Sequence, residues 1–169
     1  MWGAWLLSGT VTLRGWLAER VRREAERLGV SVEEYLVELL SQSLDPKDRA
    51  VEYVKAAGDL LEEARVELGE GNVRQAAEKL WGAAALAVKA YAYWRDGKRL
   101  SSHGELWEYK RRLEEELGEW VHDSWASATE MHVCFYEAWC AERDVTTAHK
   151  RIERLVREAA SLIKKSNPD

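Results

Sequence analysis

The sequence has little proline and no long apolar run. Its two prolines, Pro46 and Pro168, leave the chain between them without a residue that breaks helices. The most apolar stretch near the start, residues 2–7, is far shorter than the roughly 20 residues that a membrane span needs. No basic region precedes it, and no small-residue cleavage site follows, so it does not indicate a signal peptide. We therefore expect a cytoplasmic protein that makes no contact with a membrane.

Cysteine is nearly absent as well, since Cys134 and Cys140 are the only two. On one continuous helix their Cα atoms would lie roughly 9 Å apart, beyond the reach of a disulfide. The four histidines do not have the paired spacing of metal ligands. The sequence therefore predicts two free thiols, no metal site and no cofactor.

Side-chain amides and excess positive charge are also scarce. The only amides are Gln42, Asn72, Gln75 and Asn167. Few amides in a chain that is 33% charged are typical of a protein from a thermophile. A net charge of -5 excludes a wide non-specific nucleic-acid surface, because such binding depends on neutralising phosphates. Only residues 143–165 carry an excess of basic residues, so any nucleic-acid contact must be local and the last helix is its best candidate.

Apolar residues, in contrast, make up 46% of the chain and recur every three or four positions after residue 46. These helical stripes cover residues 51–68, 73–91, 102–113, 121–139 and 145–163. Strand signals are almost absent from this part of the chain. We therefore expect an all-α fold with an up-and-down bundle of five helices.

The chain before Pro46 follows a different pattern. Asp45 is biased away from helical geometry by the proline after it, which separates an arm, residues 1–45, from a bundle, residues 46–169. Residues 10–13 alternate polar and apolar like a short strand, and two helical stripes follow over residues 17–28 and 36–40. The arm is thus predicted to be strand-helix-helix. Trp2 and Trp5 are expected to pack on the bundle or on a second subunit.

The bundle also carries a family resemblance. The run "LLEEARVELGEGNVRQAAEKLWGAAALAVKAYAYWRDGKRLSSHGELWEY", followed by "ATEMHVCFYEAW", resembles the archaeal PaREP family, whose helical core is similar to HEPN (higher eukaryote and prokaryote nucleotide-binding) domains. The resemblance covers roughly residues 33–160, and the family usually has Asn where this chain has Cys134. It implies a HEPN-like bundle and a module associated with nucleotides or nucleic acid, RNA included, without an assigned catalytic activity.

Many HEPN domains are ribonucleases that use an arginine, four to six further residues and a histidine. "RDVTTAH" has that form, with Asp144 between Arg143 and His149. The guanidinium would hold a phosphate while the imidazole takes the proton of a ribose 2′-hydroxyl, without a metal. Six residues on one helix turn through roughly 240°, so Arg143 would have to lie in the loop before the helix. The alternative is that His149 is a packed histidine, which leaves open whether the chain is an enzyme.

The arm "TVTLRGWLAERVRREAERLGVSVEEYLVELL" resembles a ribbon-helix-helix module, in which paired strands of a dimer enter the major groove of DNA. Thr10, Thr12 and Arg14 would face the bases, and Val11 and Leu13 would point inward. The alternative is an arm that mediates only dimerisation or docking. We expect a homodimer in either case.

A further group of basic residues surrounds the start of the helix predicted after Ser102. Arg95, Arg99 and His103 are candidates for holding an anion there, although His103 would also suit capping and packing. His132 lies on an apolar stripe and is predicted to be a core histidine. The nine tryptophans are expected to pack in the core or an interface rather than to stack on bases.

Overall fold

The computed structural model of the protein describes residues 9–165, and these residues form seven helices and no strand. The helices are α1 (Gly15–Leu28), α2 (Val32–Leu40), α3 (Pro46–Gly69), α4 (Val73–Asp96), α5 (His103–Leu117), α6 (Trp120–Glu137) and α7 (Glu142–Lys165). The predicted all-α class is confirmed. Within the described range, no helix has the length and apolarity that crossing a membrane requires. Trp2 and Trp5, for which packing was predicted, lie outside the described residues.

The strand predicted at residues 10–13 is wrong for this chain. Residues 9–14 have no regular structure and lead into α1. A strand needs a hydrogen-bonded neighbour, and the described part of this chain offers none at that position. The two helices of the arm do form, and the Ser31 hydroxyl starts α2 by accepting a hydrogen bond from the Glu34 N–H at 3.0 Å.

Helix α4 is the centre of the bundle. It packs against α3, α5, α6 and α7, and residues 83–93 are all buried. Alanine makes up much of this stretch, so neighbouring helices can come close to the α4 backbone. At Gly82 a Cβ would lie 3.0 Å from the Leu60 side chain, and the glycine therefore permits the close approach of α3.

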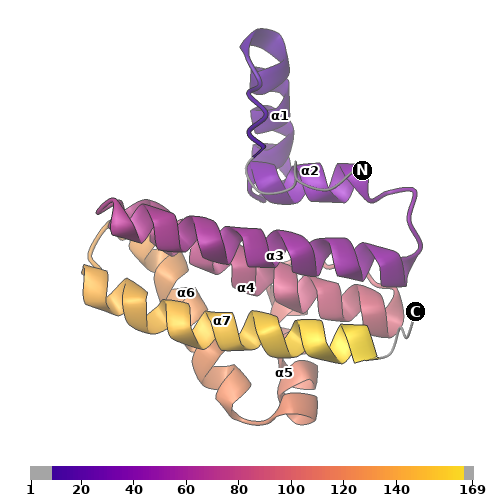
Figure 1. The fold of residues 1–169 in the computed structure, drawn as a ribbon. Coiled ribbons are helices and arrows are strands. Elements are labelled where there is room, and N and C mark those ends of the chain that lie inside the picture. The colour runs from indigo at the N-terminus through magenta and orange to yellow at the C-terminus, as the bar shows by residue number, and fades with distance from the viewer. Residues whose placement is uncertain (1–8, 166–169) are drawn as a thin grey trace, which may run out of the picture.

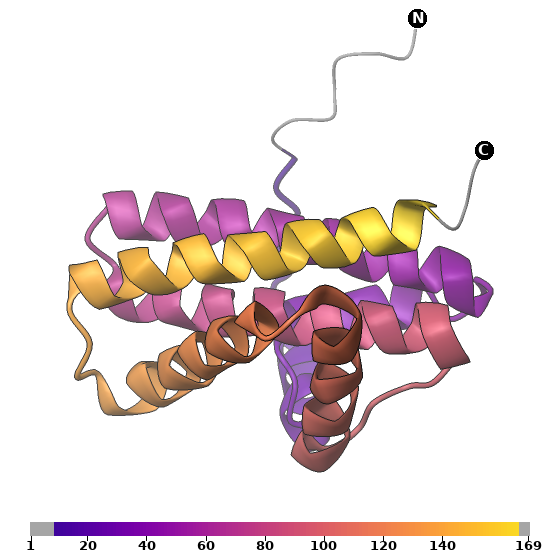
Figure 2. The ribbon, with the colours of Figure 1, turned by 90° about the horizontal axis from the view of Figure 1, so that it is seen from below.

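Three of the long helices, α3, α4 and α7, run side by side in both views of the ribbon (Figure 1, Figure 2). Helices α5 and α6 are inclined to them and cover one side of this group (Figure 2). Five helices follow Asp45, as predicted, but their inclination departs from a simple up-and-down bundle. The helices are inclined because α4 packs against neighbours on several sides, so they cannot all lie parallel in one ring around a common core.

The arm meets the bundle through α2, whereas α1 projects away from it (Figure 1). No residue of α2 is buried, and its polar contacts to the bundle are made by glutamates. Glu33 accepts a hydrogen bond from Lys79 at 2.8 Å. Asp45 ends the arm by accepting hydrogen bonds from the N–H groups of Lys47 and Asp48, which starts α3 at the predicted boundary.

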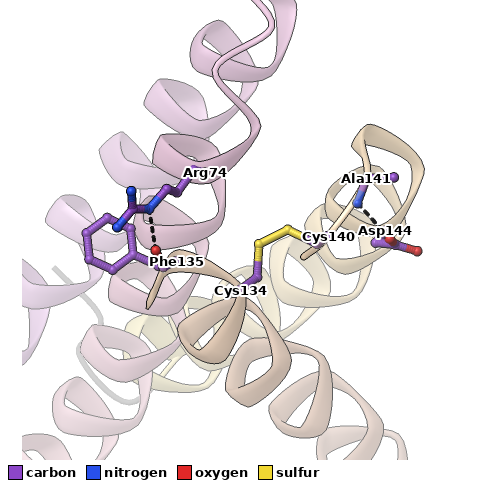
Figure 3. Close-up of a disulfide and its surroundings, with 6 residues drawn as sticks. All are labelled: Arg74, Cys134, Phe135, Cys140, Ala141 and Asp144. Carbon is purple, nitrogen blue, oxygen red and sulfur yellow. Dashed lines mark hydrogen bonds between the residues drawn. A yellow bond between two sulfur atoms is a disulfide. The ribbon is translucent and has the colours of Figure 1, made fainter. Parts of the chain in front are cut away.

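Cys134 and Cys140 form a disulfide, so the prediction of free thiols is wrong (Figure 3). That prediction assumed one continuous helix, but α6 ends at Glu137 and Ala138 turns the chain with a φ of 54°. The turn brings the two Cα atoms to 5.6 Å. Asp144 stabilises the start of α7 nearby, because its side chain accepts a hydrogen bond from the Ala141 N–H at 2.8 Å.

Candidate functional site

A cavity of about 380 Å³ lies between the arm and the bundle. One wall comes from the end of α1 and from α2, another from α4, and a third from the segment that leads into α5, with His132 of α6 beside it. This volume falls in the range of small-molecule sites, about 300–1,000 Å³. The polar and aromatic residues that line it include Arg27, Glu34, Glu38, Tyr53, Trp81, Lys89, Tyr93, Arg99, Ser101, Ser102, His103 and His132.

Three flat rings form the aromatic wall of the cavity. Trp81 of α4 is stacked on His103 of α5, with centroids 5.9 Å apart and planes within 14°. Its centroid lies 4.6 Å from that of His132, and the two imidazoles are 5.9 Å apart. Burial lowers the pKa of His132, and the charge of His103 lowers it further. Helices α4, α5 and α6 thus each contribute one ring to this aromatic cluster. Its lowered pKa means that His132 favours its neutral form there.

A second, polar part of the lining is organised around the Glu38 carboxylate. It accepts hydrogen bonds from the Tyr53 hydroxyl, from the Tyr93 hydroxyl at 3.1 Å and from the Arg99 Nε at 2.8 Å. Burial raises the pKa of Glu38, but the Tyr53 hydrogen bond, the Arg99 charge and the Tyr93 hydrogen bond outweigh it, so the pKa lies below its usual value. Burial and the bond to Glu38 also raise the pKa of Tyr53, which keeps its hydroxyl a donor.

A second ion pair also lines the cavity. Lys89 is only 8% exposed, and its ammonium donates to the Glu34 carboxylate. A buried charge is tolerated when it is paired and hydrogen-bonded in this way. The cavity therefore contains charges of both signs that arise from different helices.

The predicted anion-binding residues are only partly brought together. Arg99 and His103 line the cavity. Arg95 does not, because its guanidinium donates to the Glu116 carboxylate and to the Tyr91 hydroxyl at 3.2 Å. Anion binding stays a prediction, and of the three residues only Arg99 and His103 are positioned to share one anion in the cavity.

The predicted ribonuclease residues all lie in α7. The helix begins at Glu142, so Arg143 is in its first turn and not in the loop. The rotation of about 240° between them places Arg143 and His149 about 120° apart around the helix axis, on different faces. Arg143 is exposed, whereas the half-buried His149 donates from Nε2 to the Leu61 carbonyl at 3.1 Å. Asp144 serves the helix start instead of pointing to the histidine. Within one chain the three groups do not converge.

The predicted DNA-facing residues precede α1. Thr10, Thr12 and Arg14 are all exposed. Val11, which was expected to point inward, is 86% exposed, and Leu13 is half-buried. In a single chain these residues therefore do not alternate between an exposed and a buried face. DNA binding by the arm stays a prediction.

Sequence reasoning missed most of the polar wall of the cavity, namely Glu34, Glu38, Tyr53, Lys89 and Tyr93. One signal was present, because Lys89 is the only charged residue between Trp81 and Trp94 of an otherwise apolar helix. Across residues 9–165, no cluster of three or more His, Cys, Asp or Glu side chains could hold a metal ion.

Comparison with known proteins identifies one family. The archaeal PaREP1/PaREP8 family matches residues 52–156, which span α3 to most of α7 and therefore the helices that carry Tyr53, Trp81 and His132. No curated protein and no solved structure matches the chain.

Proposed function

We propose that this chain, which belongs to the archaeal PaREP1/PaREP8 family, binds a nucleotide in the cavity between the arm and the bundle. The observation that carries the proposal is the pairing of two unlike walls in one cavity. The rings of Trp81, His103 and His132 form one wall, and charged and hydroxyl groups around Glu38 form the other.

A nucleotide has matching chemical parts. Its base has a π face that can lie against the Trp81 ring, and base stacking on an aromatic side chain contributes about 1–3 kcal/mol. Its phosphate suits a guanidinium, which Arg99 and Arg27 provide at the cavity wall. The ribose hydroxyls and exocyclic amines are hydrogen-bond donors, for which the carboxylates of Glu34 and Glu38 are acceptors.

Isothermal titration of the protein with purine and pyrimidine mono- and triphosphates in EDTA tests the proposal. We expect Trp81→Leu and Arg99→Gln each to weaken binding by about 10-fold or more, since each removes an interaction of about 1.5–3 kcal/mol. The matched controls are Trp94→Leu and Arg112→Gln, which lie outside the cavity. Absence of binding by the folded wild-type protein, or equal binding by all four variants, would contradict the proposal.

The HEPN-like nature of the bundle belongs to the same proposal. It is supported by the all-helical fold and by five helices after Asp45. The ribonuclease centred on Arg143, Asp144 and His149 and the DNA-binding arm remain alternative predictions, each with its own experiment below.

The expected homodimer also remains a proposal. Val11, Trp16 and Leu17 of the arm are 86%, 72% and 48% exposed. A second copy would remove these side chains from water. The cytoplasmic location and heat adaptation are proposals as well, and the disulfide is compatible with both because intracellular proteins of hyperthermophilic archaea are rich in disulfides.

A further inference from the structure

The outer face of α7 carries a row of basic residues that the nucleotide cavity does not use. The row consists of Arg143, Lys150, Arg154, Arg157, Lys164 and Lys165, all of them exposed. Their spacing follows the helical repeat, so they point to one side of the helix. Between them lie Thr147 and Ser161, which are small and polar.

This row lies opposite the buried face of α7. At about 100° per residue, the row is centred roughly 180° from the residues that pack into the core. Those core residues are Val145, Ala148, Ile152, Leu155, Val156, Ala159 and Ile163. The four acidic residues of α7, Glu142, Asp144, Glu153 and Glu158, fall at the borders between the two faces, and none lies within the row.

The charges of the row are also largely unneutralised. Most lysines and arginines outside α7 form ion pairs, but in α7 the described part of the chain provides an ion-pair partner only for Arg157, which pairs with Glu158 at 3.4 Å. Arg154 has a different contact, because its guanidinium carbon lies 4.0 Å from the centre of the Trp120 ring. A protein with a net charge of -5 thus keeps one local surface strongly positive.

We propose that this outer face of α7 binds the phosphodiester backbone of a nucleic-acid duplex, independently of base sequence. The row extends over about 33 Å at 1.5 Å per residue. Along that length the two strands of a duplex together present one phosphate per about 1.7 Å of its axis, so phosphates of both strands lie beside a row of this length. This contact goes beyond the nucleotide cavity and does not depend on it.

Two other polyanions fit the row less well. Proteins that bind single strands stack bases on open aromatic rings, and α7 contains no Trp, Tyr or Phe, while Arg154 covers the ring of Trp120 in α6. Helices that bind a membrane surface insert an apolar face, and the apolar face of α7 is buried in the bundle. Duplex RNA and duplex DNA share the phosphodiester chemistry, so the experiment must compare them.

The test is fluorescence polarisation with labelled duplex RNA, duplex DNA, single-stranded RNA and anionic lipid vesicles at several salt concentrations. For wild-type protein we expect binding to duplexes. The logarithm of the association constant should fall linearly with the logarithm of the salt concentration, with a slope of about -5, as six neutralised phosphates imply. The variant Lys150→Gln/Arg157→Gln/Lys164→Gln should flatten that slope by about 3 and weaken binding at low salt.

The matched control is Arg20→Gln/Arg65→Gln/Arg112→Gln, which changes the net charge equally at three cations outside α7 that form ion pairs. This control should keep the wild-type slope. Equal loss in both triple variants, no duplex binding at low salt, or a preference for single strands or vesicles would overturn the proposal. Because the α7 variant leaves the cavity intact, its nucleotide titration should match wild type, which separates this test from that of the proposed function.

Discussion

The Glu38 carboxylate of the arm accepts a hydrogen bond from Arg99, 61 residues further along the chain, at 2.8 Å. The same carboxylate accepts from Tyr53 of α3 and Tyr93 of α4. One side chain thus links α2 to two bundle helices and to the segment before α5. Since α2 buries none of its residues, such polar contacts contribute to its attachment beside the packing of Val37 against the core.

We expect Glu38→Gln to loosen the arm in a pH-dependent way. The lowered pKa of Glu38 means that its charged form stabilises the folded state. This contribution is present above the usual carboxyl pKa near 4.5 and is lost as the pH falls through the lowered folded value. Thermal melting should show a wild-type advantage of about 1–3 kcal/mol at pH 7 that disappears in strong acid.

The control for this experiment is Glu52→Gln, which removes an exposed carboxylate that pairs with Lys55 within α3. It should melt close to wild type at both pH values, because exposed pairs contribute about 0–1 kcal/mol. A difference between Glu38→Gln and wild type that persists unchanged in acid would contradict the role assigned to the charge.

His132 should stay neutral at a pH where an ordinary histidine is half protonated, because burial and the charge of His103 both lower its pKa. Replacing His103 with Asn removes the second cause, so the pKa of His132 should rise while remaining below its usual value. Titration of the imidazole signals by NMR measures this directly. The exposed His122 provides the control, and His122→Asn should leave the His132 titration unchanged.

Reduction of the Cys134–Cys140 disulfide should lower the free energy of unfolding by about 2 kcal/mol, the loop-entropy value for a ring of this size. For a chain of this length that corresponds to a fall in Tm of about 4–8 °C. Calorimetry with and without dithiothreitol measures the shift. The variant Cys134→Ala/Cys140→Ala should melt at a temperature that the reductant does not change. An unchanged Tm of the reduced wild-type protein would show that the disulfide does not stabilise this turn.

The ribonuclease hypothesis is tested with labelled RNA in EDTA. Because Arg143 and His149 diverge on α7 and His149 is bound to Leu61, we expect a single chain to leave the RNA intact. Cleavage that disappears in His149→Ala and in Arg143→Gln would establish the enzyme and would imply that the two groups meet in an assembly. Cleavage that survives both substitutions would point to a different site.

The arm hypothesis depends on a second copy, since residues 10–13 form no strand in a single chain and would have to pair with their equivalents in a dimer. We expect the wild-type protein to sediment as a dimer and Trp16→Glu/Leu17→Glu to sediment as a monomer, because both side chains are exposed in one chain. The control Val66→Glu changes an exposed apolar residue of α3 and should remain dimeric. A monomeric wild-type protein would remove both the dimer and DNA binding through Thr10, Thr12 and Arg14.

Helices were the most predictable part of this protein. The boundary at Asp45 and Pro46, the capping of α2 by Ser31 and the break after Asp96 at Gly97 are local effects of side-chain and backbone chemistry. The strand and the free thiols were predicted wrongly, because each depended on something that local pattern does not contain. A strand forms only with a pairing partner. The pairing of the two cysteines depends on the direction that the chain takes at Ala138.

The sequence alone determined the helical class, the family resemblance and the basic outer face of α7, since each follows from residue order and the helical repeat. Only the tertiary structure decided that Glu38 meets Arg99, that Trp81 contacts both His103 and His132, and that Arg143 and His149 diverge. Such contacts depend on how helices distant in the chain are inclined and packed. Their packing is fixed by the summed fit of many side chains, which no single stretch of sequence specifies.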